Sequence, residues 1–424
     1  MSHASSEISN TSPLSAELAA APPAGLYVHL PFCVAHCPYC DFVVYAGAEE
    51  RGPRARTERL YEAVERELEL RGDALDRRFG SARPPLATLY FGGGTPSLVS
   101  GEWFERFMTT IRRRYGLTPD AEITLEANPG PDERGDLAVF AAAGVNRVSF
   151  GAQSLNVAEL RRLGRRHSPE DVASAVAEAR AAGIGSVNLD LLYDVPSQTL
   201  DGWVATLGAA LDLGPDHLSL YALTLDDPDA EGLTGETGDH LPTARGARRW
   251  REAARREQDD DRAADQYRLA SDRLAAAGWR GYEISNWARP GHESRHNLTY
   301  WERRPYEAVG PGAHAFDGAV RRWNAAGLER YIAALVPAVG PVAMPPGDSE
   351  RIAPETAASE RTILALRLDC GVAESLAADP PTAEPLAWAI SAGLLEPFDL
   401  GGEARLRLTL RGRLLSNELF RRLL

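Results

Sequence analysis

The sequence predicts an α/β fold: a partial TIM-like barrel of six β/α units with a smaller, mostly helical C-terminal domain. Three observations support this prediction. Short β-rich runs alternate with helical patterns, polar side chains stand near the ends of these runs, and a Pro-rich segment separates this region from a helical remainder. Alternating β and α segments favour parallel strands that are joined by right-handed crossovers.

The chain begins with a small and polar segment, residues 1–24, which contains no Arg. This composition predicts a disordered tail rather than a secretory signal or a transit peptide. Across the 424 residues no apolar run approaches the ~18 residues that a transmembrane helix needs. The formal net charge of −14 argues against a nucleic-acid-binding surface. Because the chain contains no Lys, a Schiff-base mechanism and a Walker-type phosphate loop are excluded.

Residues 27–42 read YVHLPFCVAHCPYCDF and hold three of the four cysteines in the pattern C-x3-C-x2-C, namely Cys33, Cys37 and Cys40. Thiolates at this spacing can surround one centre of soft metal. A fully ligated iron–sulfur cluster usually has four Cys ligands, so three leave one iron open to a small molecule. A Cys3His zinc site that uses His29 or His36 is the alternative.

The fourth cysteine, Cys370, lies far downstream in an apolar, helical context and is expected to be a buried free thiol. Four cysteines in a chain without a signal segment do not make a disulfide framework. The reducing cytoplasm is therefore the expected compartment.

Six β-rich runs are expected to form the barrel strands: residues 26–30, 86–91, 122–129, 146–154, 185–193 and 216–224. Helical patterns lie between them, among others at residues 57–70, 132–143 and 169–182. The second strand runs into the turn GGGTP, whose backbone groups can approach a polar ligand closely. An ordinary tight turn between a strand and a helix is the alternative for this segment.

Polar residues near the strand ends are candidates for the site, because barrel sites form at the C-terminal ends of strands. Glu126, Gln153 and Asp190 occupy such positions, although each by itself could be a helix cap or a surface residue. Arg165 could contact a ligand or be a solvated charge on a helix.

Residues 236–335 are expected to extend the barrel. They contain a charged helical stretch at residues 247–279, interpreted as a solvated face, and an aromatic segment with three histidines, His292, His296 and His314. A Pro-rich linker at residues 336–349 precedes the C-terminal domain, residues 350–424, which includes one predicted strand pair, GLLEPF and ARLRL.

The chain resembles the radical S-adenosylmethionine (SAM) superfamily, and within it the group that contains oxygen-independent coproporphyrinogen III oxidase and the HemW-type heme chaperones. The resemblance covers residues 25–424. It is carried by the motifs YVHLPFCVAHCPYCDF, YFGGGTPS, TLEANPG, NRVSFGAQSL, LGRRHSPED, NLDLLYDVPSQT, YEISNWARPG and RHNLTYW.

The resemblance implies a radical SAM core over residues 25–235 and a C-terminal domain similar to that of the oxidase. In that core the three clustered cysteines bind a [4Fe–4S] cluster, and the amino and carboxylate groups of SAM chelate the remaining iron. One-electron reduction of the cluster can cleave SAM to a 5′-deoxyadenosyl radical. The implied SAM contacts are Tyr27, Tyr39, Gly93, Gly94, Thr95 and Glu126, and those to a second SAM molecule are Gln153, Arg165, Asp190 and Ala222.

Two features separate the subgroups. The oxidases typically carry a further Cys where this chain has Phe42, whereas HemW-type proteins carry Phe there and an HNxxYW element, present here as HNLTYW from His296 to Trp301. That element is associated with heme binding, and a neutral imidazole can ligate heme iron. His296 is therefore the expected heme ligand, with a loop histidine satisfied by backbone hydrogen bonds as the alternative. Asp194 departs from the family pattern, which usually has Gly at this position.

The function expected from the resemblance is that of a heme-binding radical SAM protein that delivers heme to an acceptor protein. The alternative is an enzyme that oxidatively decarboxylates coproporphyrinogen III in porphyrin biosynthesis.

Overall fold

The structure is a computed structural model that describes residues 19–226, 228–378 and 380–424. A disordered tail is predicted for residues 1–24, and residues 1–18 of this segment lie outside the described residues. Within the described residues the largest sheet has 12 strands, in the order β14-β13-β12-β11-β1-β4-β5-β6-β7-β8-β10-β9.

Six consecutive strands in the middle of this sheet are parallel, which confirms the predicted barrel core. Their inward and outward faces are both covered, so the strands are rich in Leu, Val and Phe rather than alternating with polar residues. Val28, Phe91 and Val148, for example, are buried. The strands are β1 (Gly25–Leu30), β4 (Leu86–Gly93), β5 (Leu117–Ala127), β6 (Arg147–Gln153), β7 (Ser186–Tyr193) and β8 (His217–Ala222).

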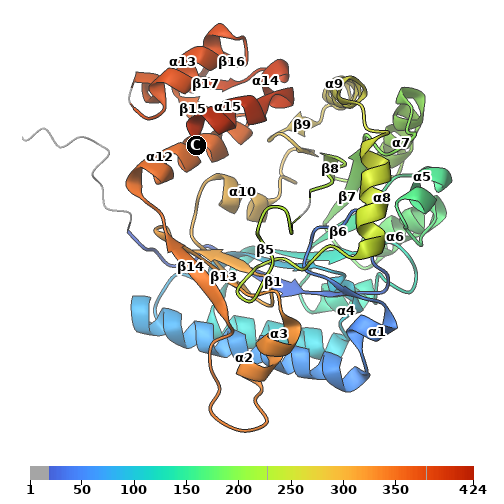
Figure 1. Cartoon of the computed structure of the whole chain (residues 1–424), viewed down its shortest axis with the longest axis vertical. Coiled ribbons are helices and arrows are strands. Elements are labelled where there is room, and N and C mark those ends of the chain that lie inside the picture. The colour runs from blue at the N-terminus through green and yellow to red at the C-terminus, as the bar shows by residue number, and fades with distance from the viewer. Residues whose placement is uncertain (1–18, 227, 379) are drawn as a thin grey trace, which may run out of the picture.

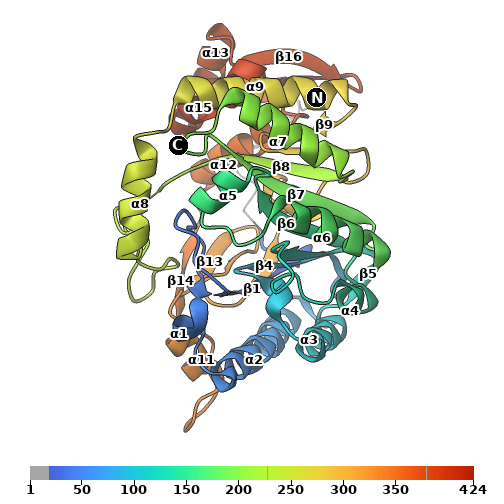
Figure 2. The ribbon, with the colours of Figure 1, turned by 90° about the vertical axis from the view of Figure 1, so that its right-hand side faces the viewer.

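Helices connect these strands and pack outside them, as Figure 2 shows for α2, α3, α6 and α7. They are α2 (Arg54–Phe79), α3 (Gly101–Arg114), α4 (Leu137–Ala142), α5 (Val157–Arg162), α6 (Pro169–Ala181) and α7 (Leu200–Asp212). Each helix from α3 to α7 begins after a residue whose side chain accepts a hydrogen bond from a first-turn N–H group. These N-caps are Ser100, Asp136, Asn156, Ser168 and Thr199.

The segment after β8 widens the sheet at both edges. At one edge β11 (Tyr306–Val309) pairs parallel with β1 and continues into the antiparallel strands β12 (His314–Phe316), β13 (Val320–Asn324) and β14 (Gly347–Arg351). Strand β14 falls at the end of the segment predicted as a linker. At the other edge lie β10 (Asn286–Ala288) and β9 (Arg280–Gly281). The helices here are α8 (Arg245–Arg255), α9 (Asp260–Ala276), α10 (Arg295–Trp301) and α11 (Leu328–Leu335).

The C-terminal residues pack around a second hydrophobic core, which includes Leu366, Leu386, Leu406 and Leu419. Figure 1 shows them gathered at one end of the molecule, with α2 at the opposite end. The predicted strand pair is present as β16 (Leu395–Leu400) and β17 (Glu403–Leu408), joined by β15 (Val372–Ala373). The helices are α12 (Pro354–Arg367), α13 (Ala383–Ser391), α14 (Leu410–Leu414) and α15 (Ser416–Leu423).

One prediction for this region is only partly correct: Cys370 is a free thiol, but it is half-buried and lies in a turn after α12, because the helix ends at Arg367. In the part of the chain that the structure describes, no helix combines the length and the apolar character needed to cross a membrane.

Candidate functional site

The three clustered cysteines lie in a loop that leaves the sheet after β1. Its two ends are held together by the parallel pairing of β2 (Phe32–Cys33) with β3 (Tyr45–Ala46), which is followed by α1 (Gly47–Arg51). Cys33, Cys37 and Cys40 are free and half-buried, and the Cys40 N–H group donates to the Cys37 carbonyl at 3.0 Å. The three thiols therefore lie in one short loop, which begins at β2 and ends before β3.

Two side chains from the barrel reach the thiols. Thr95 Oγ1 donates a hydrogen bond to Cys33 Sγ at 3.3 Å, and Arg165 Nη1 donates to Cys37 Sγ at 3.3 Å. Arg165 also donates to the Gly151 carbonyl at 2.7 Å and to the Asn128 side chain. Arg165 is thus a contact of the cysteine loop rather than a solvated charge, and it joins the loop to the ends of β5 and β6.

Burial favours the protonated form of two of these thiols, Cys33 and Cys40. It raises the pKa of Cys33 to about 11, although the hydrogen bond from Thr95 acts in the opposite direction. It also raises the pKa of Cys40, and the neighbouring cysteines add to that rise. A thiol of this kind becomes a thiolate when a metal cation binds it, because the positive charge stabilises the anion.

Arg251 is a contact of the loop that sequence reasoning missed. It lies on α8, in the stretch interpreted as a solvated face, yet its side chain is only 3% exposed. Nε donates to the Pro38 carbonyl at 3.0 Å and Nη2 donates to the Cys40 carbonyl at 2.8 Å, beside an ion pair with Asp41 at 2.7 Å. No local pattern distinguishes this Arg from its neighbours, because its partners lie more than 200 residues earlier in the chain.

The GGGTP turn packs tightly against the start of the cysteine loop. A Cβ atom at Gly94 would meet the Phe32 carbonyl oxygen at 2.7 Å, and one at Gly93, where φ is +113°, would meet the His29 ring at 2.6 Å. The turn's N–H groups are already used: Gly93 donates to Glu126 Oε2 at 3.0 Å, Gly94 to the Leu30 carbonyl and Thr95 to the Phe32 carbonyl. Glycine is needed here for close packing, and the N–H groups of these three residues are engaged within the protein.

Glu126 lies at the end of β5 inside the barrel. Besides the Gly93 N–H group, it accepts a hydrogen bond from the Tyr90 hydroxyl at 2.7 Å. Burial raises its pKa to about 7, and the nearby Asp190 carboxylate contributes to this rise. Tyr27 is close enough for Glu126 to raise the pKa of its hydroxyl further, after the larger effect of burial. Tyr27, Glu126 and Asp190 therefore lie near enough to one another for their charges to interact.

The other predicted residues differ in their surroundings. Asp190, on β7, accepts hydrogen bonds from Ser149 Oγ at 3.1 Å and from Asn188 Nδ2 at 2.7 Å. Gln153 ends β6 with φ at +64°, and Ala222 ends β8. Tyr39 packs its ring against Trp250 of α8, with centroids 6.4 Å apart.

His296, the predicted heme ligand, is buried beneath this site. Its Nδ1 atom lies 2.8 Å from Thr88 Oγ1 and its Nε2 atom 2.8 Å from the Tyr300 hydroxyl, while its ring stacks on Tyr90 at 5.1 Å. Burial lowers the pKa of His296 to about 3, so the imidazole is neutral. Both ring nitrogens are committed to hydrogen bonds, and His296 connects α10 to β4.

His29 is engaged in the same way, with Nε2 at 2.8 Å from the Val43 carbonyl and Nδ1 at 3.0 Å from the Tyr27 hydroxyl. His36 lies exposed in the cysteine loop. Over the described residues, no three His, Cys, Asp or Glu side chains converge closely enough to hold a single metal ion.

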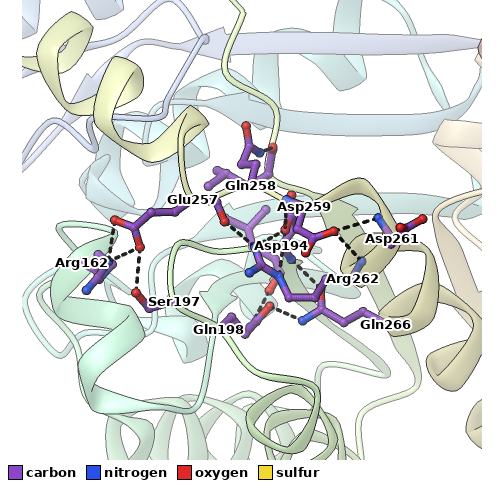
Figure 3. A network of polar contacts seen from close by, with 12 residues as sticks. Arg162, Asp194, Ser197, Gln198, Glu257, Gln258, Asp259, Asp261, Arg262 and Gln266 are labelled. Atoms are coloured by element: carbon purple, nitrogen blue, oxygen red, sulfur yellow. Dashed lines mark hydrogen bonds and ion pairs between the residues drawn. The ribbon is translucent and has the colours of Figure 1, made fainter.

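The loop after β7 contains the residue that departs from the family pattern. Asp194 has φ at +55°, a region that favours Gly, and Asp is among the few other residues that adopt it readily. Its carboxylate accepts a hydrogen bond from Arg262 Nε at 3.1 Å, and its N–H group donates to Gln266 Oε1 at 2.9 Å (Figure 3). The loop therefore keeps a geometry that suits Gly, and Asp194 adds an attachment to α9.

Comparison with known proteins places this geometry in a family. The sequence model of the radical SAM superfamily matches residues 27–210. The heme chaperone HemW of Mycobacterium tuberculosis is 40% identical over 404 residues, which cover 95% of this chain and 95% of that protein. HemW of Bacillus subtilis is 31% identical over 406 residues, or 93% of this chain and 97% of that protein.

Among solved structures, coproporphyrinogen III oxidase (HemN) from Escherichia coli, a radical SAM enzyme, matches with a TM-score of 0.73 at 22% identity. The match covers 97% of this chain and 91% of the oxidase, and at this identity it shows the fold alone. The sequence relatives carry the assignment further: this chain belongs to the HemW family of the radical SAM superfamily.

Proposed function

We propose that this protein is a radical SAM heme chaperone, which binds heme and passes it to an acceptor protein. The observation that carries the proposal is its 40% identity, over 95% of the chain, to a protein named as a heme chaperone. Phe42 adds support, because the oxidases that the chain resembles typically have a further Cys there. A cytoplasmic location is part of the proposal, and the four free cysteines are consistent with a reducing compartment.

Membership of the radical SAM superfamily implies a [4Fe–4S] cluster and SAM. We propose Cys33, Cys37 and Cys40 as the cluster ligands. In such a cluster the three thiolates would ligate separate irons, so the sulfurs need not converge on one point. Their free state and their place in one loop fit this role. When bound, the cluster supplies one-electron chemistry to SAM.

The chain's own residues then hold the loop and its charge. Arg165 keeps a guanidinium 3.3 Å from Cys37 Sγ and so places a positive charge beside this sulfur. Arg251 fixes the loop through the carbonyl groups of Pro38 and Cys40. Both arginines are suited to this because the guanidinium presents several donors in a rigid plane.

We propose that SAM is bound by Tyr27, Glu126 and the turn that contains Gly93, Gly94 and Thr95. Because the N–H groups of that turn are engaged, its contacts with SAM would use carbonyl oxygens. Glu126 supplies a buried carboxylate that a cationic ligand can pair with. The remaining predicted contacts, which include those to a second SAM molecule, are Tyr39, Gln153, Arg165, Asp190 and Ala222.

Anaerobic reconstitution followed by two parallel assays tests this function. Hemin titration is expected to give about one heme per chain. The same protein with SAM and a reductant is expected not to convert coproporphyrinogen III to protoporphyrinogen IX. Multiple turnovers of that reaction would replace the chaperone assignment with that of an oxidase.

A further inference from the structure

An open pocket of about 360 Å³ lies beside the cysteine loop. Its walls include the side chains of Phe42, Tyr300, Trp301 and Tyr306. Phe42 is 69% exposed, which is unusual for a large apolar side chain and leaves an apolar surface at the pocket without a described cover. A cavity of this size that is lined by aromatic rings with a few polar groups is typical of sites for cofactors and other organic ligands.

On the polar side of the pocket, the carboxylate of Asp239 forms hydrogen bonds with two imidazoles. Asp239 Oδ1 lies 3.0 Å from His240 Nδ1, and Asp239 Oδ2 lies 2.7 Å from His314 Nε2. All three residues line the pocket. Burial would raise the pKa of Asp239, but the hydrogen bonds from the two histidines outweigh this effect and lower the pKa. A carboxylate only accepts hydrogen bonds, so the two ring nitrogens that face Asp239 are the donors.

When an imidazole donates a hydrogen bond to a carboxylate through one ring nitrogen, the other ring nitrogen is the one that can offer a lone pair to a metal. In His240 this is Nε2, which makes no hydrogen bond with any residue that the structure describes. In His314 it is Nδ1, which lies next to the residue's own backbone and is therefore hindered toward a large planar ligand. An imidazole whose Nδ1–H group donates to a carboxylate, with Nε2 free, has the arrangement that orients metal-ligating histidines.

The HNxxYW element contributes to the same pocket, but not through its histidine. Tyr300 and Trp301 line the pocket, whereas His296 holds the Tyr300 hydroxyl from behind at 2.8 Å. Tyr300 also packs its ring on Tyr306 at 4.6 Å. The element therefore supplies part of the aromatic wall.

We propose that this pocket is the heme site, with His240 as the axial ligand through Nε2 and Asp239 as its positioning residue. The inference rests on the proposed function, since it names the place where that function's heme is held. It assigns His296 to the support of Tyr300 instead of to iron ligation. Phe42 and the aromatic side chains of α10 supply apolar surface for the porphyrin.

Hemin titration of the full chain tests the proposal, with the Soret position and the Kd as readouts. His240→Ala is expected to lose the spectrum of a histidine-ligated heme and to weaken binding at least about tenfold. Added imidazole should restore the spectrum of this variant, because a free imidazole can occupy the place of the lost side chain. His292→Ala is the matched control, since its ring lies outside the pocket and contacts Ser186 Oγ at 3.2 Å.

A ligand-exchange variant, His240→Met, keeps the test decisive if His240→Ala does not fold. Methionine is also an axial heme ligand, so this variant should shift the Soret band to a new position. Iron content after reconstitution serves as the check of folding. A wild-type protein that binds heme while both His240 variants keep its spectrum would overturn the assignment of His240 and leave the chaperone function intact. A wild-type protein that binds no heme would contradict the function itself.

Discussion

The cysteine loop and helix α10 both carry recognisable motifs, but they use their most conspicuous side chains in opposite ways. In the loop, Cys33 and Cys37 are half-buried free thiols that each accept a hydrogen bond at 3.3 Å. In α10, His296 is buried and both of its ring nitrogens are engaged. A side chain that binds a metal must keep a lone pair available. A motif therefore identifies a functional region, whereas the hydrogen bonds decide which residue in it can be a ligand.

The largest expected effect is the loss of the iron–sulfur cluster after a change in the cysteine loop. Cys37→Ala should remove the cluster, because two thiolates cannot anchor a cubane that wild-type protein holds with three. Iron content after anaerobic reconstitution should fall from about four per chain to near background. Cys370→Ala is the control. This variant should keep the full iron content, since Cys370 lies in a turn beside the C-terminal core. A stable cluster in Cys37→Ala would contradict the ligand assignment.

His296→Ala should produce the opposite pattern, a loss of stability without a loss of iron. It leaves the buried Thr88 hydroxyl and the Tyr300 hydroxyl without their partner and removes a stacked ring. Each unsatisfied group costs ~1–3 kcal/mol, so the free energy of unfolding should fall by about 3 kcal/mol. Denaturant titration measures this change. Unchanged stability, together with loss of a heme spectrum, would make His296 a ligand after all.

Glu126 should make SAM binding depend on pH. Burial raises the pKa of Glu126 to about 7, so the carboxyl group is protonated below that pH, whereas pairing with a cation requires the carboxylate. The apparent Kd for SAM should therefore rise by up to about tenfold per unit as the pH falls below 7, and should level off above it. The response of the reduced cluster's spectrum to added SAM measures the Kd. Glu126→Gln should bind SAM weakly at every pH; the same pH dependence in this variant would exclude Glu126 as its origin.

The smallest expected effect concerns the loop after β7, where backbone geometry can be separated from side-chain contacts. Asp194→Ala and Asp194→Gly both remove the contact with Arg262, but only Gly adopts a φ of +55° without strain. The Gly variant should be the more stable of the two by about 1 kcal/mol. Thermal or chemical unfolding of the pair measures the difference. Asp272→Ala, an exposed change on α9, is the control; equal stability of the two Asp194 variants would show that the backbone there is not constrained.

Much of the fold was predictable because it follows from local patterns. All six barrel strands lie within a few residues of the predicted runs, since a strand that is buried on both faces needs a short apolar stretch ended by turn residues. Helix limits were less accurate: the pattern at residues 57–70 is part of a helix that spans Arg54–Phe79, and only Leu137–Ala142 is helical within 132–143. Helix ends depend on caps and tertiary contacts that periodicity does not record.

The candidate site was predictable wherever neighbouring residues carry it. The three clustered cysteines and the GGGTP turn each lie within a short stretch of sequence, so their chemistry can be inferred from the sequence alone. Arg251, and Asp239 with His240, were not predicted as site residues. Their relevance depends on partners about 200 residues earlier for Arg251 and about 75 residues later, at His314, for Asp239.

The sequence by itself determined the order of strands and helices, the three thiols and the membership of the superfamily, because each of these is encoded in contiguous residues. Only the tertiary structure decided which polar side chains have a donor or acceptor atom that forms no hydrogen bond within the described residues. Both ring nitrogens of His296 form hydrogen bonds, one with Thr88 and one with Tyr300, whereas Nε2 of His240 forms none with a residue that the structure describes. Whether a nitrogen is free depends on which distant donors and acceptors the fold brings within about 3 Å, and no local pattern records that distance.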